Sequence, residues 1–181
     1  MSNFVRKFYI ADTHFGHEAI IRHCKRPFVS VGEMDAYMID RWNAVVMDTD
    51  IVYHLGDFCL GDAEYAQAIF RQLRGRKFLI LGNHDTRRGS PLSHIMALDW
   101  EQPPSPTLMT SDEGRQVFLS HYAHRTWPGQ HRGCIHFYGH SHNTIPHLGA
   151  SRDVGVDCKD VEFRPRTFRE LTALLPAADS E

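Results

Sequence analysis

Three observations predict a layered α/β or α+β domain. Strand and helix patterns alternate along the chain. The composition, 42% hydrophobic and 23% charged, is close to the globular average. Five apolar strand candidates also run directly into polar clusters rich in Asp, Asn and His. With 181 residues, the chain is expected to form a single domain over residues 1–181, because two domains of this size would lack adequate cores.

The N-terminal half is expected to alternate three strands with two helices. Each strand is a short apolar run that leads into a polar cluster. The first helix opens with a capping box, Ser30 to Glu33, and carries apolar residues at helical spacing. The second runs from Asp62 to about Leu73 and is stopped by Gly75. The three strands are Phe4–Ala11, Ile51–Leu55 and Lys77–Leu81.

The C-terminal half begins with a Pro-rich and Arg-containing segment from Thr86 to Glu113, where a surface loop is expected. Two apolar strands follow, and a short third strand is expected at Val154–Val156. A capping box, Thr167 to Glu170, opens a last helix, and Pro176 lies just past it. The two apolar strands are Val117–Ser120 and Ile135–Tyr138.

Charge and cysteine content exclude several classes of protein. Lys and Arg number 20 against 22 Asp and Glu, so no basic surplus points to a nucleic-acid or membrane partner. No apolar stretch approaches the roughly 18–20 residues of a membrane span, and no signal core opens the chain. The four cysteines form no C-x-x-C pair and are expected to be reduced. We therefore expect a cytoplasmic protein without a membrane partner, and the oligomeric state is left open.

The polar clusters at the strand ends contain residues typical of metal sites. In layered α/β folds, loops converge just outside the carboxyl ends of strands, so the five ends can share one site. Residues at i and i+2 of an extended chain point to the same side, which applies to Asp12 with His14 and to His140 with His142. The candidate metal ligands are Asp12, His14, Asp57, Asn83, His121, His140 and His142.

Seven ligands exceed what one tetrahedral ion can use, so two metal ions are expected, with one carboxylate bridging them. Imidazole and carboxylate ligands suit Mn²⁺, Fe and Zn²⁺. Glycines before Asp57, Asn83 and His140 allow the backbone to turn sharply and approach closely. Paired ions attract phosphate oxygens, generate hydroxide near neutral pH and stabilise both oxygens of an in-line displacement. This chemistry fits phosphoester hydrolysis.

The ordered motifs resemble those of the calcineurin-like metallophosphoesterase superfamily, which are D-x-H, G-D, G-N-H-D or -E, a lone His, and G-H-x-H. A single D-x-H is uninformative, whereas the ordered set of five is specific. The resemblance covers most of the chain and implies a four-layer αββα sandwich. The corresponding residues here are Asp12 with His14, Gly56-Asp57, Gly82–Asp85, His121 and Gly139–His142.

The resemblance also implies a role for each residue. Asp57 bridges the two ions; the first is bound in addition by Asp12, His14 and His142, and the second by Asn83, His121 and His140. His84 contacts the phosphate and protonates the leaving oxygen, and Asp85 orients the His84 imidazole. Asn83 and His84 are thus also expected to contact substrate. Mn²⁺ is the expected activator, with Fe, Zn, Ni or Co as alternatives.

The opening residues Asp12 to His17 and the short length are similar to a subgroup of small, largely uncharacterised bacterial and phage-type phosphoesterases. In this subgroup His17 is a further candidate contact for the phosphate or leaving group. His17 could instead simply begin a helix. Arg87, Arg88 and Arg125, and also His124 and Trp127, could shape the pocket, but solvated loops and core packing are the simpler interpretations.

The expected function is a metal-dependent phosphoesterase, in which hydroxide attacks phosphorus and His84 is the general acid. The expected substrate is a small phosphoester or nucleotide, with a preference for phosphodiesters because no inserted cap domain closes the cleft. Nucleic acid stays open as a substrate, since a metal pocket acts locally. A phosphomonoesterase or a nucleotide pyrophosphohydrolase is the enzymatic alternative.

Three alternatives to a phosphoesterase assign other roles to the same residues. A retromer subunit of this fold serves as a binding platform, so a non-catalytic protein-binding scaffold is the alternative of another class. A metallo-β-lactamase-type enzyme would require H-x-H-x-D-H, and the residues after His142 lack the Asp-His half. A structural zinc site would usually be closed by cysteines, and none adjoins the clusters.

Overall fold

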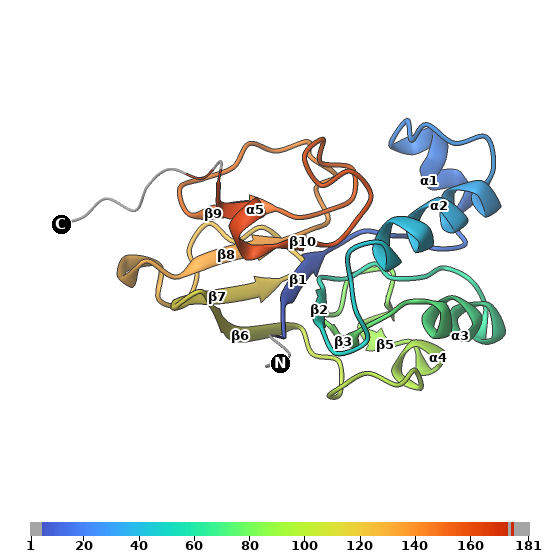
Figure 1. The fold of residues 1–181 in the computed structure, drawn as a ribbon, viewed down its shortest axis with the longest axis horizontal. Coiled ribbons are helices and arrows are strands. Elements are labelled where there is room, and N and C mark those ends of the chain that lie inside the picture. Colours follow the sequence, from blue (N-terminus) through green and yellow to red (C-terminus); the bar gives the residue numbers. More distant parts are fainter. Residues whose placement is uncertain (1–4, 174, 176–181) are drawn as a thin grey trace.

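Two four-stranded sheets lie face to face in the computed structural model, which describes residues 5–173 and 175 (Figure 1). The first sheet has the order β10-β1-β2-β3, and the second has the order β6-β7-β8-β9. The strands of the first are β1 (Lys7–Ile10), β2 (Ile51–His54), β3 (Arg76–Leu79) and β10 (Arg166–Thr167). Those of the second are β6 (Thr107–Asp112), β7 (Arg115–Ser120), β8 (Ile135–Tyr138) and β9 (Ser151–Asp153).

Parallel pairing brings the ends of consecutive strands to one edge. In the first sheet β1, β2 and β3 are parallel, whereas β10 is antiparallel to β1. In the second sheet β7, β8 and β9 are parallel, and β6 is antiparallel to β7. Because parallel strands need crossover connections, helices separate β1, β2 and β3 in the chain.

The helices α1 to α4 gather on one side of the first sheet, away from the second (Figure 1). A short hairpin precedes α4, and α5 follows β10 directly. The helices are α1 (Glu18–His23), α2 (Val31–Asn43), α3 (Ala63–Gln72), α4 (Ser93–Met96), the 3-10 helix η1 (Gln130–Arg132) and α5 (Phe168–Thr172). The hairpin strands are β4 (Thr86–Arg87) and β5 (Ser90–Pro91).

The predicted helix starts are confirmed by their caps. Ser30 accepts a hydrogen bond from the Glu33 amide (3.2 Å) at the start of α2. The Glu33 carboxylate accepts from the Val29 amide rather than from Ser30, so the box is displaced by one residue. Asp62 caps α3, and α5 has a complete capping box between Thr167 and Glu170.

Alternation along the strands builds two cores. In β1, Phe8 and Ile10 pack among the helices, whereas Tyr9 faces the second sheet. There the Tyr9 ring meets Phe137 of β8 edge to face, with ring centroids 4.9 Å apart. Both faces of the first sheet are therefore buried, which explains its nearly continuous apolar strands.

The layered α/β class is confirmed, and the fourth layer is small. The outer face of the second sheet is covered by the loop that carries η1, with Phe118, Trp127 and Cys134 as a minor core. Trp127 is 6% exposed and donates to the Cys134 carbonyl, so it packs against the sheet. The single-domain organisation over residues 1–181 stays a prediction.

Two sequence-based expectations were wrong. The segment 86–113 is not a plain loop, because it contains β4, β5, α4 and the six-residue strand β6. β6 lies at a sheet edge and alternates exposed with half-buried residues, so it has no apolar run to reveal it. The last strand of the second sheet is Ser151–Asp153 rather than Val154–Val156, and β10 was not predicted. Pro176 lies outside the described residues.

The cysteines are free thiols, in agreement with the sequence-based prediction. Within residues 5–173, no helix combines the length and the apolar character needed to cross a membrane.

The core between the sheets should contribute strongly to stability. Phe137 is fully buried and also faces the Phe168 ring of α5. We expect Phe137→Ala to lower the free energy of unfolding by about 3–5 kcal/mol, measured by urea denaturation. Val29→Ala, at a side chain that is 95% exposed, should change it by less than about 0.5 kcal/mol. Equal effects of the two substitutions would contradict this assignment of the core.

Candidate metal centre

The seven candidate ligands converge at the shared edge of the two sheets. Each follows a strand: Asp12 and His14 after β1, Asp57 after β2 and Asn83 after β3, with the remaining three after β7 and β8. A cavity of about 760 Å³ opens at this edge. Five of the seven line it, and Asp12 and His121 are buried at 0% and 1% exposure. The cavity-lining candidates are His14, Asp57, Asn83, His140 and His142.

Backbone hydrogen bonds tie the strand-end loops together. The amides of Asp12 and His14 donate to the carbonyls of Gly56 and Asp57, both at 3.0 Å. The Asp12 carboxylate in turn accepts from the His140 amide at 2.9 Å, which joins the first sheet to the second. These hydrogen bonds hold the loops that carry the ligands close together.

Five candidate ligands have left-handed backbone conformations. The φ angles are 58° at Asp12, 51° at His14, 58° at Asp57, 66° at His140 and 45° at His142. This region is costly for residues with a Cβ, and such strain collects at functional sites where the surrounding structure enforces it. The strain turns the side chains out of the strand direction and toward one another.

Glycines make room for two of these carboxylates. A Cβ on Gly82 would collide with the Asp57 carboxylate. A Cβ on Gly139 would lie 2.7 Å from Asp12 Oδ2 and 2.6 Å from the Ala11 Cβ. Both positions therefore require glycine because of close approach, as the sequence indicated for the residues before Asn83 and His140.

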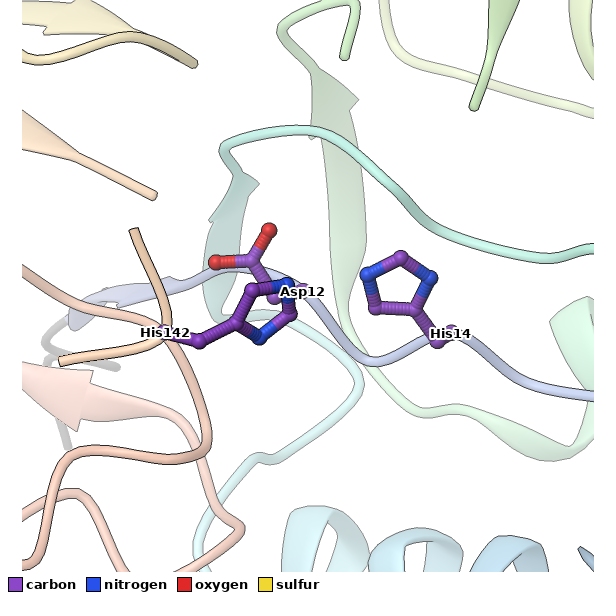
Figure 2. Close-up of side chains that lie close together, drawn as sticks. All are labelled: Asp12, His14 and His142. Atoms are coloured by element: carbon purple, nitrogen blue, oxygen red, sulfur yellow. The ribbon is translucent and has the colours of Figure 1, made fainter. Parts of the chain in front are cut away.

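Asp12, His14 and His142 form the first donor group. Their ligand atoms all lie within 4.8 Å of one another. Figure 2 shows Asp12 and His14 on the segment that follows β1, with His142 facing them from a separate segment. The His14 and His142 rings are stacked, with centroids 5.3 Å apart.

Asp57, His121 and His140 form the second donor group, also within 4.8 Å of one another. His121 Nδ1 lies 2.7 Å from the Leu55 carbonyl, to which it donates, and this leaves Nε2 as the acceptor that faces the group. Asn83 Oδ1 lies 3.0 Å from the same Nε2. The second group therefore includes the amide that the sequence predicted.

One carboxylate oxygen lies between the two groups. Asp57 Oδ2 is 3.5 Å from His14 Nε2 and 3.5 Å from His121 Nε2, and Asp57 Oδ1 accepts from the His84 amide at 2.8 Å. His14 Nε2 is buried and has no hydrogen-bond partner. A buried, unpartnered imidazole nitrogen beside a carboxylate oxygen is the donor arrangement that divalent cations take up. The residues present therefore fit a pair of metal ions.

Burial sets the protonation of the donors. It raises the pKa of both Asp12 and Asp57, and it lowers the pKa of His14 and that of His121, the latter to about 4. His142 differs: burial opposes its protonation, but hydrogen bonds to Asp157 and Cys24 raise its pKa to about 10. The neutral imidazoles keep a lone pair for a cation, which would also offset the buried carboxylate charges.

His84 is exposed at the rim of the cavity, with its ring centroid 5.1 Å from that of His14. Asp85 does not contact the His84 ring as expected. Its buried carboxylate accepts from the amides of Gly82 (2.9 Å), Asp57 (2.7 Å) and Phe58 (3.0 Å). The three hydrogen bonds from these amides involve both carboxylate oxygens, so Asp85 fixes the loops that carry Asp57 and His84.

His17 is the N-cap residue of α1 and also lines the cavity, and its contact with a phosphate or leaving group stays a prediction. Sequence reasoning missed Arg22 and His23 of α1, which line the same wall. They follow His17 by five and six residues, so the i+3 and i+4 spacings of one helix face gave no signal for them. Arg87, Arg88, Arg125, His124 and Trp127 do not line this cavity.

Sequence reasoning also missed three supporting residues outside the motifs. Asp153 accepts from Ser141 Oγ (2.6 Å) and from the Asn143 amide (3.0 Å), and thereby holds the G-H-x-H loop. Asp157 and Arg26 contact the first donor group from two other loops. Asp153 ends β9, but the sequence placed that strand at Val154–Val156, and neither Asp157 nor Arg26 stands in a recognisable pattern.

Known sequences include proteins that are similar to part or most of this chain. No family model matches the chain. The uncharacterized protein MJ1445 of Methanocaldococcus jannaschii is 49% identical over 84 residues, which are 45% of this chain and 48% of the relative. The chain thus spans about half the length of that relative. The Gene 66 protein of Mycobacterium phage L5 is 28% identical over 162 residues, which are 76% of this chain and 78% of the phage protein.

Among solved structures, the protein AQ665 of Aquifex aeolicus, of unknown function, has a TM-score of 0.70 at 22% identity. The alignment covers 95% of this chain and all of AQ665, so the two chains share a fold. An archaeal phosphodiesterase gives a TM-score of 0.48 at 15% identity, over 83% of this chain and 82% of its own.

Removal of the shared carboxylate tests the arrangement of the two groups. Since Asp57 Oδ2 lies between both, Asp57→Ala should abolish the binding of both metal ions, measured by elemental analysis after reconstitution with Mn²⁺. Asp48→Ala, at a side chain that is 89% exposed, is the control and should retain the metal content of the unmodified protein. Two ions bound to Asp57→Ala would show that the carboxylate is not shared.

Proposed function

We propose that the protein is a metal-dependent phosphoesterase of the calcineurin-like superfamily, with phosphodiesters as its substrates. The observation that carries the proposal is the position of Asp57 Oδ2, at 3.5 Å from one imidazole of each donor group. Two adjacent donor sets with a shared carboxylate are suited to a pair of divalent ions. Mn²⁺ is the proposed activator, with Fe, Zn, Ni or Co as alternatives.

The residues of the first donor group, with Asp57, would hold one ion, and those of the second group, with Asn83, would hold the other. When bound, such a pair supplies an activated water and neutralises charge on a phosphoryl group. The chain itself contributes orientation. Backbone hydrogen bonds between the loops, and the hydrogen bonds that the Asp85 carboxylate accepts from amides, hold the donor residues in place before any ligand binds.

His84 is the proposed general acid. Its ring borders the cavity and is exposed, so it can reach a leaving oxygen, and it lies beside His14 and His17. Its amide donates to Asp57 Oδ1, which places the ring next to the shared carboxylate. The proton would pass from an imidazole nitrogen of His84 to the departing oxygen. Asp85 supports this residue only through the loop.

The shape of the cavity supports a diester. A volume of about 760 Å³ lies within the roughly 300–1,000 Å³ typical of small-molecule sites. The cavity extends from the donor groups to α1, where Ala19 and Ile20 provide an apolar wall beside Arg22. The space between this wall and the donor groups could hold a second organic group on the phosphate. A nucleotide or a nucleic-acid end would present both an apolar and an anionic part to it.

A phosphomonoesterase or nucleotide pyrophosphohydrolase is the second candidate, favoured by the cationic Arg22 and His23 on the cavity wall. A non-catalytic scaffold is the candidate of another class; the chain retains a complete donor set, which a scaffold does not need. A cytoplasmic location without a membrane partner belongs to the same proposal.

A metal-by-substrate screen tests the proposal directly. After chelation by EDTA the protein should be inactive, and Mn²⁺ should restore hydrolysis of bis(p-nitrophenyl) phosphate more than that of p-nitrophenyl phosphate. Cyclic nucleotides and single-stranded nucleic acid complete the screen. Preference for the monoester would favour the second candidate, and no hydrolysis with any divalent ion would favour the scaffold.

His84→Ala should lower kcat by roughly two to four orders of magnitude, as expected for the loss of a general acid. The metal content should stay unchanged, since His84 belongs to neither donor group as defined above. His131→Ala, at an exposed histidine of η1 that does not line the cavity, is the matched control and should leave kcat unchanged. Equal rates for the two variants would discard His84 as the acid.

Arg22 tests the α1 wall. For a diester that carries a further phosphate, Arg22→Gln should raise KM by about threefold to tenfold, since it removes a charged hydrogen bond at a partly solvated site. For bis(p-nitrophenyl) phosphate, which lacks that phosphate, KM should not change. Lys25→Gln, outside the cavity lining, is the control. A KM that rises equally for both substrates would contradict this role of the wall.

A further inference from the structure

We propose that Arg26 and Asp157 form a positioning unit that selectively prepares the first donor group for its metal ion. This inference rests on the proposed function, because it assumes that Asp12, His14 and His142 bind an ion. Arg26 lies between α1 and α2, and Asp157 lies between β9 and β10. Neither residue belongs to the strand-end motifs.

Arg26 fixes the segment after β1. Its guanidinium donates from Nη2 to the Asp12 carbonyl (2.7 Å) and from Nη1 to the Thr13 carbonyl (3.0 Å). These carbonyls flank the left-handed turns at Asp12 and His14, where φ is 58° and 51°. Hydrogen bonds to the turn oppose its relaxation to an extended strand. Arg26 thereby maintains the direction in which both ligands project.

Asp157 fixes His142. Asp157 Oδ2 lies 2.7 Å from His142 Nδ1, so the imidazole donates from Nδ1 and presents Nε2 to the donor group. Asp157 is held by two parallel hydrogen bonds from Arg26, from Nε to Oδ1 (2.9 Å) and from Nη2 to Oδ2 (2.8 Å). The bidentate geometry orients the carboxylate plane as well as its position. A single guanidinium thus connects all three ligands of the first donor group.

The charges of the unit are balanced. The Arg26 side chain is 0% exposed and that of Asp157 is 7% exposed, so each compensates the other in a nearly water-free environment. Without Asp157, the buried Arg26 guanidinium would lie uncompensated next to the first donor group, which is proposed to bind a metal cation. In the nearby cluster of Cys24, His142 and Asp157, the guanidinium bonds both oxygens of Asp157.

The second donor group is supported mainly by residues outside this unit. His121 is oriented by the Leu55 carbonyl, and the loop of Asp57 is fixed by Asp85. The hydrogen bonds of Arg26 go to Asp12, Thr13, Met34 and Asp157, so its link to the second group is indirect, through the His140 amide that donates to the Asp12 carboxylate. Disruption of the unit should therefore weaken the first ion more than the second, whereas a general loss of stability would weaken both.

The test compares two buried arginines. Arg26→Gln and Arg166→Gln are each reconstituted with Mn²⁺, and bound metal is measured by elemental analysis and by electron paramagnetic resonance. Arg166 is buried, pairs with Glu162 and Glu170, and does not line the cavity. We expect Arg26→Gln to retain about one ion, with loss of the coupling between two Mn²⁺ ions. Arg166→Gln should retain two ions even if its melting temperature falls.

Asp157→Asn serves as a second variant if Arg26→Gln does not fold. The substitution preserves the shape of the side chain. The ion at the first donor group should then bind at least about tenfold more weakly, as expected when a supporting partner of a metal ligand is changed. Two tightly bound ions in Arg26→Gln or in Asp157→Asn, or equal loss of both ions, would overturn the inference. An unmodified protein that binds no ions would overturn the proposed function and this inference together, whereas a two-ion Arg26→Gln variant would overturn the inference alone.

Discussion

The hydrogen bond from the His140 amide to the Asp12 carboxylate connects the two sheets at the edge where their strands end. The residues around this hydrogen bond are closely packed. Gly139 packs against Ala11, and Ala11 forms a β-bridge with Gly155. Because His140 and His142 follow this contact directly, their position relative to Asp12 and His14 depends on it. A side chain that is a candidate ligand is therefore also part of the framework that brings the other ligands near.

This double use has an energetic consequence. Burial and the neighbouring Asp153 raise the pKa of Asp12, which means that its ionised form is disfavoured in the protein without a cation. Five ligand positions also have left-handed backbone, which costs free energy at each residue. The two cores on the faces of the first sheet supply the stability that offsets these costs. A cation that binds only the folded state would stabilise it further by mass action.

The fold class and the meeting of the strand ends could be predicted because they follow from local patterns. Apolar runs identify buried strands, and the polar residues that follow them mark the strand ends. The extended i, i+2 geometry expected for Asp12 with His14 is not what the structure has, because both residues lie after β1 in left-handed conformations. Residues whose role depends on distant segments could not be found in this way. Arg26 is 131 positions from Asp157 and comes from an irregular loop, so no periodicity relates them. The edge strand β6 was missed for a different reason, since its half-buried residues form no apolar run.

Asp85 shows where adjacency in sequence misleads. A carboxylate beside a histidine suggests that one orients the other, but the turn between Gly82 and Asp85 directs the carboxylate back toward main-chain amides. The two donor groups thus differ in their support. His121 of the second group is oriented by the Leu55 carbonyl, which side-chain substitution cannot remove, whereas His142 of the first group is oriented by an ion pair between two side chains. Main-chain support persists as long as the strands are paired, but a side-chain ion pair can be lost locally. The first site should therefore be the more variable of the two in metal affinity, even though both share the Asp57 carboxylate.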